Sequence, residues 1–171
     1  LSLATVDENG APQIRCVSAV HYESRAIYFL TARGKEMARQ LMADGRVQTL
    51  VHTRFNEMIR MSGVATPALD SEQVYWRDVI YAEQPYLANV YPADTRDINI
   101  IFKVENLVLD YFNLGVRPIE RAVFTLDEDM ATVPRIDVAA LVDPAGDARD
   151  RRRVAERIDA AYAELVDRPS S

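Results

Sequence analysis

The segment Thr31-Ala-Arg-Gly-Lys35 holds the side chains best suited to binding a small anion. It joins a predicted strand to a predicted helix, and the backbone N–H groups of a first helical turn have no partner within the helix. Thr31 adds a hydroxyl, while Arg33 and Lys35 add cations. Gly34 lets the backbone approach a ligand closely. Together these donors suit a phosphate group, although a solvated helix start carries the same residue types, so both interpretations stay open.

Two further arginines lie in the middle of predicted strands. Arg15 follows Gln13 by two positions and precedes Val17 by two, so a regular strand places all three on one face. Arg60 occupies a similar position in the run 58–63. Each arginine is either a cation directed at a ligand or one that is exposed or paired across the sheet. Cys16 alternates to the other face, and we expect it to be a small buried residue.

Other kinds of chemistry have little support in the sequence. His21 and His52 stand alone, without the spacing of a metal site, and we expect surface or hydrogen-bonded histidines and no metal. A single cysteine excludes a disulfide or a cysteine-held metal within one chain. The sequence shows no nucleophile elbow, nucleotide phosphate loop or dinucleotide glycine pattern.

Length and composition fit a single domain or one domain with an appendage. The chain has 171 residues, of which 49% are apolar and 27% charged, and a net charge of −6. The negative charge argues against nucleic-acid binding. No apolar run approaches the roughly 20 residues of a spanning helix, and no signal peptide opens the chain. We therefore expect a cytoplasmic protein without a membrane span, with a removed leader left open.

The hydrophobic pattern predicts a mainly β domain over residues 1–126. A hairpin is expected at Asn9-Gly10, because this pair is typical of tight β-turns. Predicted helices cover 34–45 and 71–80, and an irregular, tyrosine-bearing connection covers 84–97. The predicted strands cover residues 1–6, 11–20, 25–31, 46–53, 58–66, 98–105, 107–113 and 120–126. Many antiparallel strands with short helices between them predict a closed or nearly closed barrel.

Residues 127–171 form a predicted C-terminal extension of different character. Its first part is acidic and resembles a loop, and a helix is expected at about 146–165. A narrow apolar stripe runs along that helix at three- and four-residue steps, formed by Val154, Ile158, Tyr162 and Leu165. We expect the helix to pack on the barrel or on a partner subunit.

The order and spacing of five stretches resemble the pyridoxamine 5′-phosphate oxidase-like family, the FMN-binding split barrels. The first stretch runs from Leu3 through the Asp-Glu-Asn-Gly turn to Arg15, and the second is Ala-Ile-Tyr-Phe-Leu-Thr over 26–31. The others are Gly-Lys-Glu-Met-Ala-Arg-Gln-Leu over 34–41, Met-Ile-Arg-Met-Ser-Gly over 58–63, and Val-Tyr-Pro-Ala-Asp-Thr-Arg over 90–96.

The resemblance implies a six-stranded antiparallel split barrel that forms a homodimer, with FMN at the interface. It implies that Arg15 and the backbone near Val17 lie along the flavin and that Arg60 faces the same cleft. The resemblance also implies that the segment Thr31–Lys35 holds the FMN phosphate. The residues expected to contact FMN are thus Arg15, Val17, Thr31, Arg33, Lys35 and Arg60.

The resemblance also implies an activity, an FMN-dependent oxidoreductase acting on a small-molecule substrate. A non-enzymatic flavin binder or sensor is the alternative, and a haem- or deazaflavin-binding member of the same fold is a weaker one. Two departures qualify the comparison. Many relatives have a lysine where this chain has Met37, and true pyridoxamine phosphate oxidases end in an arginine-bearing strand rather than a polar helix. The second departure argues against that specific activity.

Overall fold

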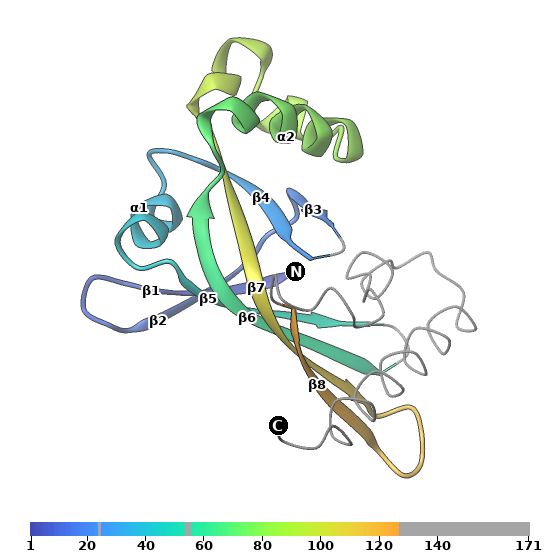
Figure 1. The fold of residues 1–171 in the computed structure, drawn as a ribbon. Coiled ribbons are helices and arrows are strands. Elements are labelled where there is room, and N and C mark those ends of the chain that lie inside the picture. The colour runs from blue at the N-terminus through green and yellow to red at the C-terminus, as the bar shows by residue number, and fades with distance from the viewer. Residues whose placement is uncertain (24, 54–55, 127–171) are drawn as a thin grey trace, which may run out of the picture.

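The computed structural model describes residues 1–23, 25–53 and 56–126, which form one curled antiparallel sheet with helices at its margins (Figure 1). The strands are β1 (Ser2–Val6), β2 (Pro12–Cys16), β3 (Val20–Tyr22), β4 (Ile27–Ala32), β5 (Arg46–His52), β6 (Glu57–Pro67), β7 (Asn99–Asn113) and β8 (Glu120–Leu126). The helices are α1 (Glu36–Ala43), α2 (Asp70–Glu83), α3 (Leu87–Val90) and the 3₁₀ helix η1 (Ala93–Ile98).

The segment from β2 to β3 joins the two ends of the sheet. The strand order is β2-β1-β5-β6-β7-β4-β3, so the two terminal strands are consecutive in the sequence. Between them, the Val17 N–H donates to the Leu1 carbonyl at 2.8 Å, and the Leu30 N–H donates to the Ala19 carbonyl at 3.0 Å. The segment thus bonds to β1 at one end and to β4 at the other. Counting it once gives a six-stranded ring, and the predicted split barrel is confirmed.

The predicted strand 11–20 is therefore two strands. The chain changes partner from β1 to β4 within it, and residues 17–19 lie between the two ladders. The following residues His21 and Tyr22, outside the predicted strands, belong to β3.

Strand β7 is a single strand of 15 residues, so the prediction of two strands over 98–105 and 107–113 was wrong. One edge of β7 pairs with β6 along most of its length, which keeps the chain extended. The other edge pairs with β4 over residues 99–104 and with β8 over 107–113, as Figure 1 shows. The register with β6 shifts at Gly63, where a Cβ atom would lie 2.8 Å from a Val104 methyl group. This close approach explains why glycine occupies the shift.

The apolar residues form two clusters that share β4. Ile27 and Phe29 point into the barrel, while Tyr28 and Leu30 pack in a second cluster beneath α2 and α3. Every residue of β4 is buried, which explains its continuous apolar run. Fully burying a side chain such as Phe29 contributes about 1.5–3 kcal/mol, so both clusters hold this strand in place.

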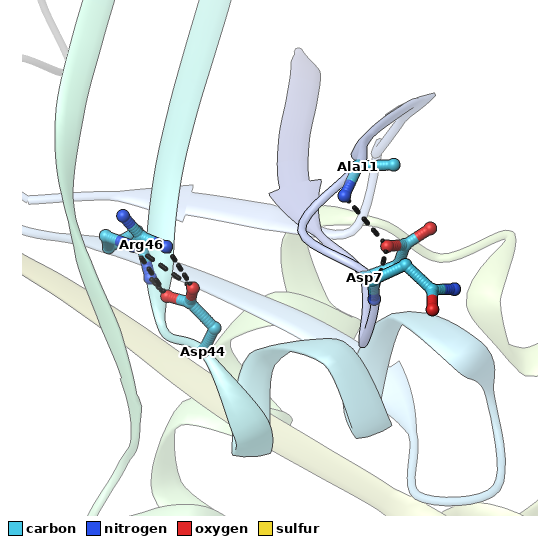
Figure 2. Close-up of polar contacts among 5 residues, drawn as sticks. Asp7, Ala11, Asp44 and Arg46 are labelled. Atoms are coloured by element: carbon cyan, nitrogen blue, oxygen red, sulfur yellow. Dashed lines mark hydrogen bonds and ion pairs between the residues drawn. The ribbon is translucent and has the colours of Figure 1, made fainter.

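Two aspartates stabilise turns of the chain, Asp7 in the turn that follows β1 and Asp44 in the turn that follows α1 (Figure 2). Asp7 Oδ1 accepts the N–H groups of Asn9 and Ala11, each at 2.9 Å, and these bonds lower the pKa of Asp7. The predicted hairpin is confirmed, with Gly10 alone in the left-handed region at φ 79°. Asp44 binds the Arg46 guanidinium, which lowers the pKa of Asp44 to about 2. Asp7 thus closes the turn between β1 and β2, and Asp44 closes the turn between α1 and β5.

Several element boundaries differ from the prediction. Helix α2 runs longer than the expected 71–80, and the irregular connection contains α3 and η1. Cys16 is exposed, so its predicted burial was wrong. It pairs with Ser2, which pairs with Leu50, in a row across the outer face of the sheet. The extension 127–171, with its expected helix at about 146–165, lies outside the described residues. Among the described helices, none has the length and apolarity needed to span a membrane.

Candidate functional site

A cleft of about 540 Å³ opens where β2, β4, α1 and α3 come together. One side is formed by the β2–β3 connection and the end of β4, and the other by the segment around α3. Its lining residues are Arg15, Cys16, Val17, Ser18, Ala19, Leu30, Thr31, Lys35, Glu36, Met37, Tyr86, Leu87, Val90 and Tyr91. The volume lies within the range of small-molecule sites, about 300–1,000 Å³.

Lys35 stands at the N-terminal end of α1, where its extended backbone forms the helix cap position. Its ammonium donates to the Tyr91 hydroxyl at 2.7 Å and lies 5.2 Å from the centre of that ring. A phenol is a neutral partner. The bond therefore fixes the ammonium while leaving its positive charge uncompensated.

Arg15 enters the same cleft from β2. Its Nη1 donates to the Thr5 hydroxyl at 2.6 Å, and its Nη2 donates to Gln40 Oε1 at 2.9 Å. Burial lowers the pKa of Arg15, and the nearby Glu36 carboxylate raises it, but an arginine stays protonated in proteins. Both hydrogen-bond partners of this guanidinium are neutral.

The acid at the cleft is held by a cation outside it. Glu36 lines the cleft at the first turn of α1, and its carboxylate pairs with Arg39 one turn further along. Of the described lining residues, Arg15 and Lys35 are cationic and Glu36 is anionic. Arg39 partly neutralises the negative charge of Glu36. The cleft as a whole therefore favours a negatively charged ligand.

The opposite wall is apolar with a polar rim. Leu87 is buried, Val90 is exposed, and Tyr86 and Tyr91 flank them. The hydroxyl groups of Ser18 and Tyr86 lie 2.6 Å apart, which links the β2–β3 connection to the wall. An apolar wall opposite a cationic one suits a ligand with a planar ring and an anionic end.

The structure brings together four of the six predicted cofactor residues. Arg15, Val17, Thr31 and Lys35 all line the cleft. Arg33 lies instead on a neighbouring groove with Arg39 and Met42. Arg60 lies on the outer face of the sheet, in another groove of the same chain. The contacts of all six with FMN stay predictions.

Sequence reasoning missed the contribution of α3. The sequence predicted only a tyrosine-bearing connection over residues 84–97, which holds Tyr86 and Tyr91. Their positions in the wall come from the fold of residues 84–91, which the sequence predicted only as irregular. Met37 also lines the cleft, at the position where many relatives have a lysine.

The second hollow, which we call the outer groove, has a volume of about 460 Å³. At its centre, Asp110 forms ion pairs with two arginines. It accepts a hydrogen bond from Arg121 Nη2 at 2.9 Å and also pairs with Arg60. Hydrogen bonds from Arg121, opposed by partial burial and reinforced by Arg60, lower the pKa of Asp110. Around this group the exposed apolar side chains of the outer face are Ile14, Leu50, Val108 and Val123.

Both histidines of the chain lie away from the cleft lining. His21 Nδ1 bonds to Glu83 Oε1 at 2.8 Å and His21 Nε2 bonds to Glu23 Oε1 at 2.9 Å, so both ring nitrogens are engaged. His52 is exposed. This arrangement disfavours an axial haem ligand. Among the described residues, no group of His, Cys, Asp and Glu side chains gathers as metal ligands would.

The fold is that of the mainly β split barrels. A NimC/NimA family protein from Clostridium acetobutylicum superposes with a TM-score of 0.57 at 19% identity, covering 73% of this chain and 82% of that one. A pyridoxamine 5′-phosphate oxidase-related, FMN-binding protein from Nostoc punctiforme gives a TM-score of 0.58 at 17% identity, covering 74% and 80%. At these identities the likeness concerns the fold alone.

The family follows from the sequence comparison. The model of the family described as pyridoxamine 5′-phosphate oxidase matches residues 1–99, and the chain belongs to that family. A pyridoxine/pyridoxamine 5′-phosphate oxidase from Anaeromyxobacter dehalogenans is 36% identical over 78 residues, covering 44% of this chain and 39% of that protein. One from Rhodopseudomonas palustris is 30% identical over 91 residues, covering 53% and 41%. The matches thus span about two-fifths of these relatives.

Proposed function

We propose that the chain binds FMN in the cleft, with the phosphate toward Lys35 and Thr31 and the ring system along Arg15, Val17 and the α3 wall. The observation that carries this proposal is the state of the two cations. Lys35 and Arg15 are each held by neutral side chains, so their charge stays available to an anion. Membership of the family supports a flavin as the ligand.

The donors present fit the group. A phosphate monoester needs cationic and hydroxyl donors at one end, which Lys35 and Thr31 provide at the junction of β4 and α1. The ring system needs an apolar, partly aromatic surface, which Leu87 and Tyr91 provide. Met37 supplies no charge, so Lys35 would take the place of the lysine that many relatives have at the position of Met37.

We further propose that two copies of the chain associate through the outer face of the sheet. Ile14 and Leu50 are 74% and 40% exposed there, an unfavourable arrangement for large apolar side chains in water. Cys16 belongs to a row of this face and also lines the cleft, so the two regions adjoin. A partner on the outer face would therefore lie beside the cleft and limit access of water to it.

The resulting activity is that of a flavin-dependent oxidoreductase with a small-molecule substrate. When bound, the flavin supplies the redox chemistry, and the protein supplies binding, orientation and electrostatics. Lys35 and Thr31 would fix the phosphate end, Arg15 would place positive charge beside the ring system, and the α3 wall would exclude water.

The test is the visible spectrum of the purified protein, followed by anaerobic reduction with NADH and with NADPH. Two flavin bands that bleach rapidly with either donor would support the oxidoreductase. Bands that persist with both donors would support a non-enzymatic flavin binder or an enzyme that takes electrons from a different donor. A protein that shows no flavin bands and takes up no added FMN would overturn the proposal.

A further inference from the structure

A closed triangle of hydrogen bonds stands behind the cleft wall at Arg15. Arg15 Nη1 donates to Thr5 Oγ1 at 2.6 Å, and Arg15 Nη2 donates to Gln40 Oε1 at 2.9 Å. The Thr5 hydroxyl closes the triangle by donating to the same Gln40 oxygen at 2.6 Å. Thr5 and Gln40 are only 2% and 5% exposed. The triangle therefore joins β1, β2 and α1 through buried polar atoms.

The direction of every bond in the triangle is fixed. An arginine can only donate, so the Thr5 oxygen accepts from it and directs its own hydrogen to Gln40. The Gln40 oxygen accepts twice, and its amide nitrogen faces Glu36 Oε1 at 3.5 Å. Turning the Gln40 amide over would place its N–H groups against the guanidinium and against the hydroxyl. A single arrangement of the three side chains is thus stable.

This arrangement prepares Arg15 for a ligand. The triangle uses two of the five N–H groups of the guanidinium, which leaves three available. A free arginine side chain loses about 2 kcal/mol of rotamer entropy when a ligand orders it. Here much of that ordering is done by the fold before any ligand arrives. Since Thr5 and Gln40 are neutral, the order is achieved without cancelling the charge.

We propose that Gln40, supported by Thr5, is a positioning residue that holds the Arg15 guanidinium at the cleft for the bound flavin. The inference rests on the proposed function, because it names a second layer of the same site. Neither residue lines the cleft, so each acts through Arg15. A purely structural role, tying α1 to the barrel, is the alternative that the experiment must separate.

The test measures FMN affinity and melting temperature for Gln40→Met, Arg15→Ala and the double variant. Gln40→Met keeps the shape of the side chain and removes the acceptor. We expect it to weaken FMN binding by about three- to tenfold, and to have no further effect when Arg15 is already alanine. Gln40→Glu keeps the acceptor oxygen but adds a carboxylate beside the guanidinium, so it should hold Arg15 in place and still bind FMN more weakly than wild type. Gln13→Met is the matched control, because Gln13 shares the strand face of Arg15 but bonds to Asp7.

Two results would overturn the inference. One is an equal loss of affinity from Gln40→Met with and without Arg15. The other is an unchanged affinity in Gln40→Met while Arg15→Ala weakens binding. In either case Gln40 does not act through the guanidinium. A lower melting temperature of Gln40→Met with unchanged FMN affinity would show that Gln40 only joins α1 to the barrel.

A ligand-free measurement separates this inference from the proposed function. The Arg15 Nε–Hε resonance in a ¹H–¹⁵N spectrum reports the order of the side chain without FMN. It should be sharp in wild type and in Gln13→Met, and averaged in Gln40→Met. If FMN fails to bind but this pattern holds, the proposed function is wrong and the positioning survives. A resonance that is averaged already in wild type would overturn the positioning.

Discussion

The cleft and the outer groove are similar in volume, yet they treat their cations in opposite ways. In the cleft, Lys35 and Arg15 are bound by a phenol, a hydroxyl and an amide. In the outer groove, Arg60 and Arg121 share the carboxylate of Asp110. Neither cation of the first pair is bonded to a carboxylate, while the single carboxylate of Asp110 compensates half of the charge of the second pair. The type of partner, more than the number of cations, indicates which hollow can bind an anion.

The surroundings of the two hollows differ in the same sense. The outer groove lies on an open sheet face with exposed side chains such as Ile14 and Leu50. The cleft is walled on its apolar side by α3, with Leu87 buried beneath. A partly compensated cluster of charges within an apolar face suits a protein partner, whereas cations without a carboxylate partner beside an apolar wall suit a small anionic ligand.

The largest expected effect concerns the outer face. Leu50→Asp should convert a dimer into a monomer, because a two-fold interface would bury the new carboxylate twice, at about 2 kcal/mol or more each time. Sedimentation velocity should show a change from two chains to one of 19.3 kDa. Val74→Asp, at a position 55% exposed on α2, is the control and should leave the dimer intact. A monomeric wild-type protein would remove the outer face as an interface.

A smaller effect is expected in the cleft. Lys35→Ala removes one charge-assisted contact to the phosphate, of order 1.5–3 kcal/mol, so FMN affinity should fall by roughly 10–100-fold. Fluorescence titration of the apo protein measures this. Lys103→Ala is the matched control, since that lysine pairs with Glu105 outside the cleft. Equal affinities in Lys35→Ala and wild type would take Lys35 out of the site.

The ion pairs of Asp110 in the outer groove should contribute to the stability of the fold and have little effect on FMN affinity. Asp110→Asn should lower the free energy of unfolding by about 1 kcal/mol at neutral pH and leave FMN affinity unchanged. The pKa of Asp110 is lowered below its ordinary 3.8, so its contribution is present above that pH and is lost as the pH falls through the lowered value. Urea unfolding of both proteins against pH checks this. A tenfold loss of FMN affinity would contradict the separation of the two hollows.

The smallest effect is a pH dependence at His21, which links β3 to α2 behind the wall. Burial opposes the charge, but hydrogen bonds to Glu23 and Glu83 prevail and raise the pKa of His21 above its ordinary 6.5. Its stabilising contribution is therefore full below pH 6.5 and is lost as the pH rises through the raised pKa.

The variant His21→Gln tests this directly. Its melting temperature should lie below that of wild type at about pH 6 and approach it at about pH 8.5, with a difference worth less than about 1 kcal/mol. A gap that is constant over this range would show that His21 contributes by packing on Trp76 rather than by charge.

The barrel could be predicted from the sequence because its signals are local. Gly10 in the hairpin turn and the mostly apolar, fully buried β4 follow from turn chemistry and burial. The partner change within residues 12–22 was not predicted, because no glycine or later proline marks the point where the chain stops pairing with β1 at Cys16 and starts pairing with β4 at Val20. The same holds for β7, whose continuity depends on β6.

Local pattern predicted the end of the site at Thr31–Lys35, and the family resemblance added Arg15 and Val17. Lys35 and Thr31 are four positions apart, and a strand–helix junction places them together. Tyr91 lies 56 residues from Lys35, and Gln40 lies 25 residues from Arg15, so their pairing depends on packing. The local sequence pattern therefore indicates which residues can bind an anion. Their neutral hydrogen-bond partners, which leave the positive charge uncompensated, are known only from the tertiary structure.

The most direct test of the central claim compares FMN with riboflavin, which lacks the phosphate, in titrations of the same apo protein. If the cations of the cleft bind the phosphate, FMN should bind at least about tenfold more tightly than riboflavin, and Lys35→Ala should remove most of that difference. Equal affinities for the two flavins in the wild-type protein would contradict the account.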